Sequence, residues 1–179
     1  MILGLVGSEM CIRDSNVLTA SIHENVVSNW NWIEALIASV PIAILVMLIV
    51  WINQFQDAPS DAAVGKNTWV VRTAEKGEWM KLEKPLRLYK QFMIEAFVAV
   101  ALVGALSFFT DFGTVYAFMA LIPIALVWKA FKMADEWMIK WNNPNADRQK
   151  VPYELLLVNV STIGIHFLTG ILLAVAYIL

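Results

Sequence analysis

The chain has 179 residues, of which 59% are hydrophobic and 16% are charged, and its mean hydropathy is +0.64. Soluble domains are about half apolar, so this composition excludes an ordinary soluble domain and indicates an integral protein of the lipid bilayer. The formal net charge of −2 argues against nucleic-acid binding, which requires a basic face. The single cysteine, Cys11, cannot form a disulfide within the chain.

The first 15 residues do not fit the rest of the chain. A short apolar start is followed at once by charged residues, with neither a basic n-region nor an apolar h-region of useful length, so the segment is not a signal peptide. Its run GLVGSEMCIRDS looks like a translated sequencing adapter. We therefore expect residues 1–15 to be a non-native artefact and residues 16–179 to form the domain.

The first membrane helix is expected at about residues 33–52, close to the ~20 residues that a bilayer core requires. Trp30 and Trp32 lie at its mouth, where tryptophans anchor a helix to the interface. Pro41 should kink this helix without breaking it, because neighbouring helices can satisfy the freed carbonyl. Glu34 is expected at headgroup level.

Three more membrane helices follow at about residues 91–109, 114–131 and 155–179, so the expected fold is an all-α membrane bundle of about four helices. The short link after residue 109 forces the second and third helices into an antiparallel hairpin. Lysine and arginine gather in the segment 53–90 and again between the third and fourth helices. By the positive-inside rule, both segments face the cytoplasm.

Glu95 and the tryptophan pair after the third helix can each be interpreted in two ways. Glu95 lies about one turn inside the second helix, with Gln91 on the same face; it is either a functional group facing a basic partner in the bundle or a carboxylate that reaches the headgroups. Trp137 and Trp141 follow the third helix, and the pattern favours interfacial anchors over a stacking site for substrate.

The last helix carries a polar stripe on an otherwise apolar sequence. A polar stripe in lipid must face protein or a water-filled cavity. It therefore either lines an active cavity or packs against other helices through hydrogen bonds, with His166 a neutral buried partner; the pattern favours packing. The stripe consists of Asn159, Thr162, His166 and Thr169.

Residues 53–72, NQFQDAPSDAAVGKNTWVVR, carry the main candidate site. Asn53, Asp57 and Asp61 recur every four residues, the spacing that stacks side chains on one helical face. Carboxylates so placed are hard ligands suited to Mg²⁺, which binds proteins through one or two carboxylates plus substrate phosphates. Lys66 and Arg72 supply a point charge and a planar fork for phosphate oxygens. The alternative to a metal–phosphate site is a solvated juxtamembrane segment of mixed charge with no binding function.

The backbone of this stretch has three expected features. Pro59 cannot sit in an undisturbed helix interior, so we expect a kink or restart between the two aspartates. Gly65 should let the chain turn back towards the ligand. Residues 68–73 are rich in β-branched side chains and are expected to be extended.

The order and spacing of these residues resemble the second aspartate-rich motif of the UbiA-type membrane prenyltransferases. The pattern N-x-x-x-D-x-x-x-D-x-x-x-G-K-x-T-x-x-V-R is that of the branch that prenylates 1,4-dihydroxy-2-naphthoate in menaquinone synthesis. The resemblance covers the chain from about residue 30 to its end. It departs at residues 73–79, where the family continues with Leu-Gly and another helix.

This resemblance implies nine membrane helices around one cavity, with two aspartate-rich motifs facing each other at its cytoplasmic mouth. The chain supplies four helices and one motif, and no N-D-x-x-D pattern of the first motif occurs in it. We therefore expect it to correspond to the C-terminal half of such an enzyme, in the bacterial cytoplasmic membrane. No internal repeat is evident.

The resemblance also implies roles for the motif residues. Asp57 and Asp61 would hold Mg²⁺ on the diphosphate of a polyprenyl diphosphate, and Asn53 would orient an aspartate or coordinate the metal. Lys66 and Arg72 would bind the diphosphate and stabilise the charge that builds on it as it leaves. An aromatic acceptor, a quinone precursor, would then attack the allylic cation. Much of the acceptor site would lie outside this chain.

Two other classes of function remain open. In one, the chain is a non-catalytic four-helix membrane protein that binds a cation or a lipid headgroup. In the other it belongs to a transporter, which predicts intramembrane ionisable pairs and broken helices at the midplane. Only His166 lies that deep in the sequence, so the transporter interpretation ranks last.

We predict that the purified 179-residue chain has no prenyltransfer activity, because half of the diphosphate-binding constellation implied by the resemblance is missing. The measurement is product formation from a radiolabelled polyprenyl diphosphate, with a family member that carries both motifs as positive control. Turnover by this chain would contradict the prediction.

Overall fold

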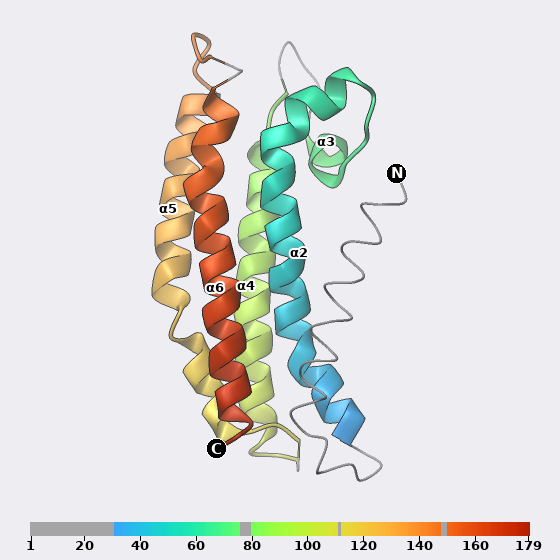
Figure 1. The fold of residues 1–179 in the computed structure, drawn as a ribbon, viewed down its shortest axis with the longest axis vertical. Helices are drawn as coiled ribbons and strands as arrows, with labels where there is room; N and C mark the ends of the chain where they lie inside the picture. Colours follow the sequence, from blue (N-terminus) through green and yellow to red (C-terminus); the bar gives the residue numbers. More distant parts are fainter. Residues whose placement is uncertain (1–30, 76–79, 111, 148–149) are drawn as a thin grey trace.

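The structure, a computed structural model, describes residues 31–75, 80–110, 112–147 and 150–179 (Figure 1). The non-native segment expected at residues 1–15 lies outside the described residues. So do Trp30 and the side chain of Trp32, for which interfacial positions are expected.

The fold is all-α, as expected, and has no strand within the described ranges. Four helical segments are long and apolar enough to cross a membrane: Ile33–Ala63, Glu83–Leu106, Val115–Trp141 and Val151–Ala176. Figure 1 shows these four segments running along a common long axis. The prediction of about four membrane helices is therefore confirmed.

The elements follow one another in chain order as α2 (Asn31–Ala63), the short α3 (Trp69–Thr73), α4 (Glu83–Leu106), the 3₁₀ helix η1 (Val115–Leu121), α5 (Ile124–Trp141), the 3₁₀ helix η2 (Val151–Leu155) and α6 (Leu156–Ala176). In Figure 1, α3 flanks the end of α2, and the C-terminus lies at the opposite end of the bundle. The bundle therefore has a motif-bearing end, where residues 53–72 lie, and a far end, where the C-terminus lies.

The largest correction to the expected bounds concerns α2. It runs eleven residues beyond residue 52, so the first part of the segment expected as a loop at 53–90 is helical. The restart expected at Pro59 is wrong, because the helix continues through both Pro41 and Pro59. A proline removes one backbone hydrogen bond and crowds the carbonyl four residues earlier, but its fixed φ is compatible with a helix, so the helix can continue past it. The last turns of α2 lean towards α3 in Figure 1.

Prolines also explain the bounds of the next two helices. The second helix begins at Glu83 rather than 91, because Pro85 lies in its first turn, where backbone N–H groups have no helical partner. The third helix, expected as one helix over 114–131, is split. Pro123 takes the N-cap position of α5, the preceding turns tighten into η1, and α5 continues to Trp141.

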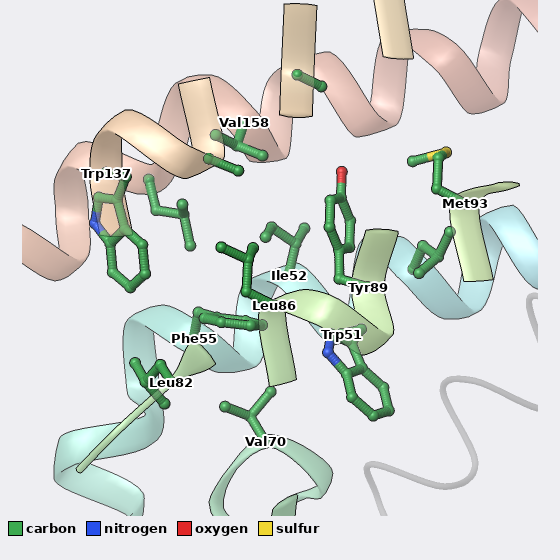
Figure 2. Packing of buried hydrophobic residues seen from close by; sticks show 14 of the residues in the cluster. Trp51, Ile52, Phe55, Val70, Leu82, Leu86, Tyr89, Met93, Trp137 and Val158 are labelled. Carbon is green, nitrogen blue, oxygen red and sulfur yellow. The ribbon is translucent and has the colours of Figure 1, made fainter. Parts of the chain in front are cut away.

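The largest hydrophobic cluster lies towards the motif-bearing end of the bundle (Figure 2). Trp137 and Trp141 belong to it and are only 3% and 2% exposed, so the expectation that they anchor the chain to the interface is wrong. Their indole N–H groups donate to Val151 O at 2.7 Å and to Met80 O at 2.9 Å. A buried indole is stable there because its polar atom is satisfied within the protein.

Glu34 and Asn53 mark the apolar part of α2. The rise of an α-helix between them is about 28 Å, close to the ~30 Å hydrocarbon core of a bilayer. Between the two residues the sequence is apolar except for Ser39, whose hydroxyl donates to Leu36 O. The edge of the hydrocarbon core at the motif-bearing end therefore lies near Asn53, and the last turns of α2 project beyond it.

The far end is closed by the link between α4 and η1. Gly113 has a φ of +82°, and its N–H donates to Glu34 Oε1 at 3.0 Å. A Cβ on Gly113 would lie 2.4 Å from Val103 O. Glu34 is therefore a structural cap for this link as well as a polar residue at the boundary.

We predict that Gly113→Ala destabilises the protein by at least ~1 kcal/mol, through the backbone clash and the left-handed φ. Gly164→Ala is the matched control: a Cβ there meets nothing within 4 Å, and alanine is the better helix former. Thermal unfolding in detergent measures both. Equal stabilities of the two variants would contradict the prediction.

Candidate functional site

The two aspartates of the motif differ in their surroundings. Asn53 and Asp57 are exposed, whereas Asp61 is only 8% exposed. Residues four apart on an α-helix are rotated by about 40° from each other, so the face that begins at Asn53 turns by about 80° before it reaches Asp61. The three side chains therefore do not share one face of α2 as expected. Each is rotated further around the helix, and Asp61 faces the loop that follows α2.

The end of α2 brings Lys66 back to Asp61. Gly65, at φ +73°, donates its N–H to Ala62 O at 3.1 Å, and the N–H of Lys66 donates to Asp61 O at 2.8 Å. These two bonds form a Schellman C-cap, which requires a left-handed residue after the helix. The expected turn at Gly65 is therefore confirmed, and the cap itself places residue 66 over the last turn of α2.

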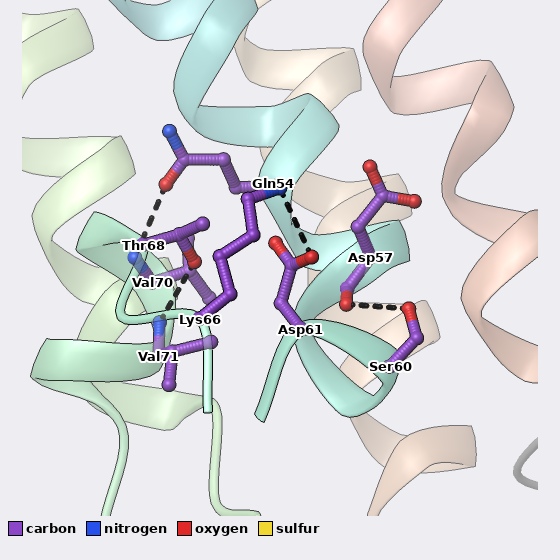
Figure 3. A network of polar contacts seen from close by, with 8 residues as sticks. All are labelled: Gln54, Asp57, Ser60, Asp61, Lys66, Thr68, Val70 and Val71. Carbon is purple, nitrogen blue, oxygen red and sulfur yellow. Dashed lines mark hydrogen bonds and ion pairs between the residues drawn. The ribbon is translucent and has the colours of Figure 1, made fainter. Parts of the chain in front are cut away.

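The side chains complete this contact. Lys66 Nζ lies 3.0 Å from Asp61 Oδ1; the aspartate side chain is 12% exposed and that of the lysine 61%. Figure 3 shows the Asp61 carboxylate turned towards Lys66, with Asp57 one turn earlier pointing away from the pair. The Asp57 backbone carbonyl accepts from Ser60 Oγ at 2.9 Å. The Asp61 carboxylate is therefore neutralised by a cation of the chain, whereas that of Asp57 is exposed and forms no ion pair with the other described residues.

The segment after Gly65 folds back along α2. Gln54 Oε1 accepts the N–H of Val70 at 3.3 Å, and Thr68 Oγ1 caps the N-terminus of α3 through Val71 N (Figure 3). Residues 69–73 are helical, so the expectation of an extended segment is wrong; the buried Val70 and Val71 find their apolar contacts on a helix instead of a strand. Gln54 is a site residue that the sequence pattern did not single out.

Arg72 is the motif residue that the structure leaves apart. It is exposed on α3 and forms no ion pair among the described residues, whereas Lys66 is paired. The carboxylates of Asp57 and Asp61 and the ammonium of Lys66 thus lie on adjacent turns, and the guanidinium of Arg72 comes from a separate short helix.

Asn53 is tied to the last helix. Asn159 Nδ2 donates to Asn53 Oδ1, and Tyr89 OH and Thr162 Oγ1 share a hydrogen bond of 2.7 Å. Two members of the polar stripe therefore make interhelical hydrogen bonds, as expected for packing. The other two, His166 Nε2 and Thr169 Oγ1, are buried with no hydrogen-bond partner in the part of the chain described here.

Glu95 lies on an exposed face of α4. Gln91 Nε2 donates to Glu95 Oε1 at 2.8 Å, and no basic side chain pairs with this carboxylate within the described ranges. Side chains of a helix lean towards its N-terminus, which for α4 is the motif-bearing end. This geometry favours a carboxylate that reaches the headgroup level over a functional group facing a basic partner.

The donor set at the end of α2 fits Mg²⁺ only in part. No group of three or more His, Cys, Asp or Glu side chains that could hold a metal ion occurs in the described residues. Mg²⁺ does not need such a cage, because it retains waters and binds through one or two carboxylates plus phosphate oxygens. Asp57 and Asp61 fit that mode, in which a phosphate ligand completes the coordination.

No protein-family model, curated protein or solved structure matches this chain in comparisons of its sequence and fold.

We predict a coupling energy of about 0.6–1.7 kcal/mol between Asn53 and Asn159 in a double-mutant cycle of alanine substitutions, which spans the average and the maximum found for interhelical hydrogen bonds in membranes. Unfolding free energies in mixed detergent measure it. The pair Asn53 and Thr162 is the matched control, with no coupling expected. Additive effects of Asn53→Ala and Asn159→Ala would contradict a structural role for this hydrogen bond.

Proposed function

We propose that the end of α2 binds the diphosphate of a polyprenyl diphosphate through Mg²⁺, as part of a prenyltransferase of the UbiA type that alkylates an aromatic quinone precursor. The observation that carries this proposal is the Asp61–Lys66 pair: a carboxylate and an ammonium 3.0 Å apart, with the open carboxylate of Asp57 one turn away. The family is inferred from the resemblance of residues 53–72 to its second aspartate-rich motif.

The position of this group relative to the bilayer supports the proposal. Asp57 and Asp61 lie beyond Asn53, where the apolar part of α2 ends. A polyprenyl diphosphate has the same division, because its diphosphate is charged and its chain is apolar. With its diphosphate bound at the end of α2, its prenyl chain would lie in the hydrocarbon core.

The Asp61–Lys66 pair is suited to exchange its partners. Without a ligand, Lys66 compensates the largely buried Asp61 carboxylate. Mg²⁺ with a diphosphate offers both groups a stronger partner: the carboxylate coordinates the metal, and the ammonium donates to phosphate oxygens. Asp57 is exposed and would coordinate without first losing an ion pair.

The transfer step needs charge stabilisation at the leaving group. The bond between C1 of the prenyl chain and the diphosphate oxygen breaks, and its electron pair leaves with the diphosphate. Bound Mg²⁺ would supply Lewis-acid stabilisation of that charge. Lys66 donates to the leaving oxygens, and Arg72, exposed on the adjacent α3, extends the positive end of the site. The electron-rich aromatic carbon then forms the new C–C bond. In the naphthoate branch the acceptor releases CO₂, and the electron pair of the broken bond between the ring and the carboxyl carbon restores the aromatic ring. An acceptor without that carboxylate would release a proton instead.

The identity proposed for the acceptor, 1,4-dihydroxy-2-naphthoate, rests on the sequence pattern alone. We infer a bacterial cytoplasmic membrane from the same resemblance. From the lysines and arginines of residues 53–90 we infer that the end of α2 faces the cytoplasm, the side where prenyl diphosphates are made.

The partial donor set favours one alternative. Among the described residues, two carboxylates, those of Asp57 and Asp61, lie at the end of α2, and that of Asp61 is already paired with Lys66. A non-catalytic membrane protein that binds a cation or lipid headgroup could use the same groups. Such a protein would bind Mg²⁺ or phospholipid without preference for a diphosphate.

We predict that the purified chain binds farnesyl diphosphate in a Mg²⁺-dependent manner, and that Asp57→Asn and Asp61→Asn each weaken this binding at least tenfold. Each substitution removes a charged metal ligand but keeps the size of the side chain. Titration calorimetry in detergent with and without Mg²⁺ measures the affinities.

Glu136→Gln, an exposed charge on α5, is the matched control and should bind like wild type. Wild-type affinity in both aspartate variants would refute the proposed site. Binding of Mg²⁺ with no response to diphosphate would favour the non-catalytic alternative.

A second prediction separates the two roles of Lys66. Lys66→Met should weaken farnesyl diphosphate binding by about 10- to 150-fold, the ~1.5–3 kcal/mol of a hydrogen bond to a charged group. The variant should bind Mn²⁺ alone at least as tightly as wild type, because the Lys66 ammonium no longer competes with the metal for the Asp61 carboxylate. Electron paramagnetic resonance measures this binding.

Lys132→Met, at an exposed position on α5, is the control for the loss of one positive charge. Loss of Mn²⁺ binding in Lys66→Met, or equal diphosphate affinities in the two lysine variants, would contradict this role.

A further inference from the structure

Trp69 is a large apolar side chain in an unexpected place. It is the first residue of α3, and 63% of it is exposed, although the two residues that follow it are buried. An indole exposed to this extent is common where a ring meets the boundary of a bilayer, because its body is apolar and its N–H needs a polar partner.

The contacts of α3 fix the depth of Trp69. Its ring lies against that of Trp51, with centroids 6.0 Å apart, and Trp51 in turn contacts Phe92 at 5.9 Å. The next residue, Val70, is held by its hydrogen bond to Gln54. Trp69 therefore lies beside residues 51–54 of α2, the level at which the hydrocarbon core ends.

The start of α4, which this aromatic group contacts through Trp51, carries two exposed basic residues and one exposed acidic residue, Glu83. Trp51 Nε1 donates to Pro85 O at 3.2 Å, which joins the aromatic group to the first turn of α4. Lys84 and Arg87 flank Pro85 and are exposed. Cations at this level are attracted to anionic phospholipid headgroups.

We propose that α3 docks into the headgroup layer of the bilayer through Trp69, with Lys84 and Arg87 beside it facing anionic lipid. The inward side of α3, Val70 and Val71, packs on the protein, and its outward side meets the membrane. The bilayer is thus a structural partner of the loop between α2 and α4.

This docking bears on the candidate site, in a part of the inference that rests on the proposed function. Residues 64–68 join α2 to α3, so α3 holds the C-terminal end of the turn that carries Lys66. A lipid surface that holds Trp69 limits the movement of this turn. It thereby keeps the Lys66 ammonium close to Asp61 and to any diphosphate bound there.

The first experiment measures docking in the wild-type chain and does not involve diphosphate. The protein is labelled with 5-fluorotryptophan and placed in nanodiscs of phosphatidylglycerol and phosphatidylcholine, and the ¹⁹F resonance of Trp69 is assigned with Trp69→Phe. A nitroxide on the lipid headgroup should broaden the Trp69 resonance at least threefold more than that of Trp141, which is buried at the same end of the bundle.

Trp128 on α5, 76% exposed, serves as a second exposed reference, since it lies away from the motif-bearing end. Broadening of Trp69 no greater than that of Trp141 overturns the proposal, including the case in which only a water-soluble gadolinium chelate affects Trp69.

The second experiment tests the coupling to the site. Trp69→Ser should weaken Mg²⁺-dependent farnesyl diphosphate binding at least threefold in nanodiscs, while Trp69→Phe keeps it near wild type. Equal affinities in the serine and phenylalanine variants overturn the coupling. Headgroup broadening of Trp69 in a wild-type chain that binds no diphosphate would uphold docking and refute the proposed function, so the two failures are distinguishable.

Discussion

The arrangement of the candidate site depends on the way α2 ends. Gly65 adopts a left-handed φ of +73°, and the two backbone bonds of the cap reverse the chain over the last turn of the helix. That reversal sets Lys66 against Asp61 and starts the return towards α3. A residue with a Cβ would meet no atom at Gly65, so the requirement is conformational and not steric.

The pair formed by this cap is strong enough to position Lys66 and weak enough to release it. The lysine side chain is 61% exposed, so water screens its charge, whereas the aspartate side chain is only 12% exposed and needs a cation beside it. A divalent cation with a diphosphate can therefore replace the pair, because it gives the carboxylate another cation and the ammonium another anion. The rigid parts lie beneath: the Asn53–Asn159 bond ties α2 to α6, and a cluster of buried aromatic residues fills this end of the bundle.

The number and approximate place of the membrane helices could be predicted because apolar runs of bilayer length are visible in sequence. Their ends could not, because the effect of a proline depends on its place in a turn. Pro85 falls in a first turn and is accommodated, Pro123 divides a helix, and Pro59 stays within one helix.

The site was predictable to a similar degree. The charges and the turning glycine were evident from their spacing, and the turn lies where expected. The burial of Trp137 and the hydrogen bond of Gln54 to Val70 depend on contacts between residues far apart in sequence, which a local pattern does not contain. For the same reason the exposure of Trp69 became evident only from the fold.

The most direct measurement of the central claim is pulsed electron–nuclear double resonance on the chain loaded with Mn²⁺ and farnesyl diphosphate, with ¹³C in the aspartate carboxylates. Mn²⁺ takes the place of Mg²⁺, and its couplings report which nuclei lie in its coordination sphere. Couplings to both ³¹P and aspartate ¹³C, with the ¹³C coupling lost on joint replacement of Asp57 and Asp61 by Asn, are the result expected. Coupling to ³¹P alone would mean that the metal stays with the free diphosphate, which would contradict a metal–diphosphate site at the end of α2.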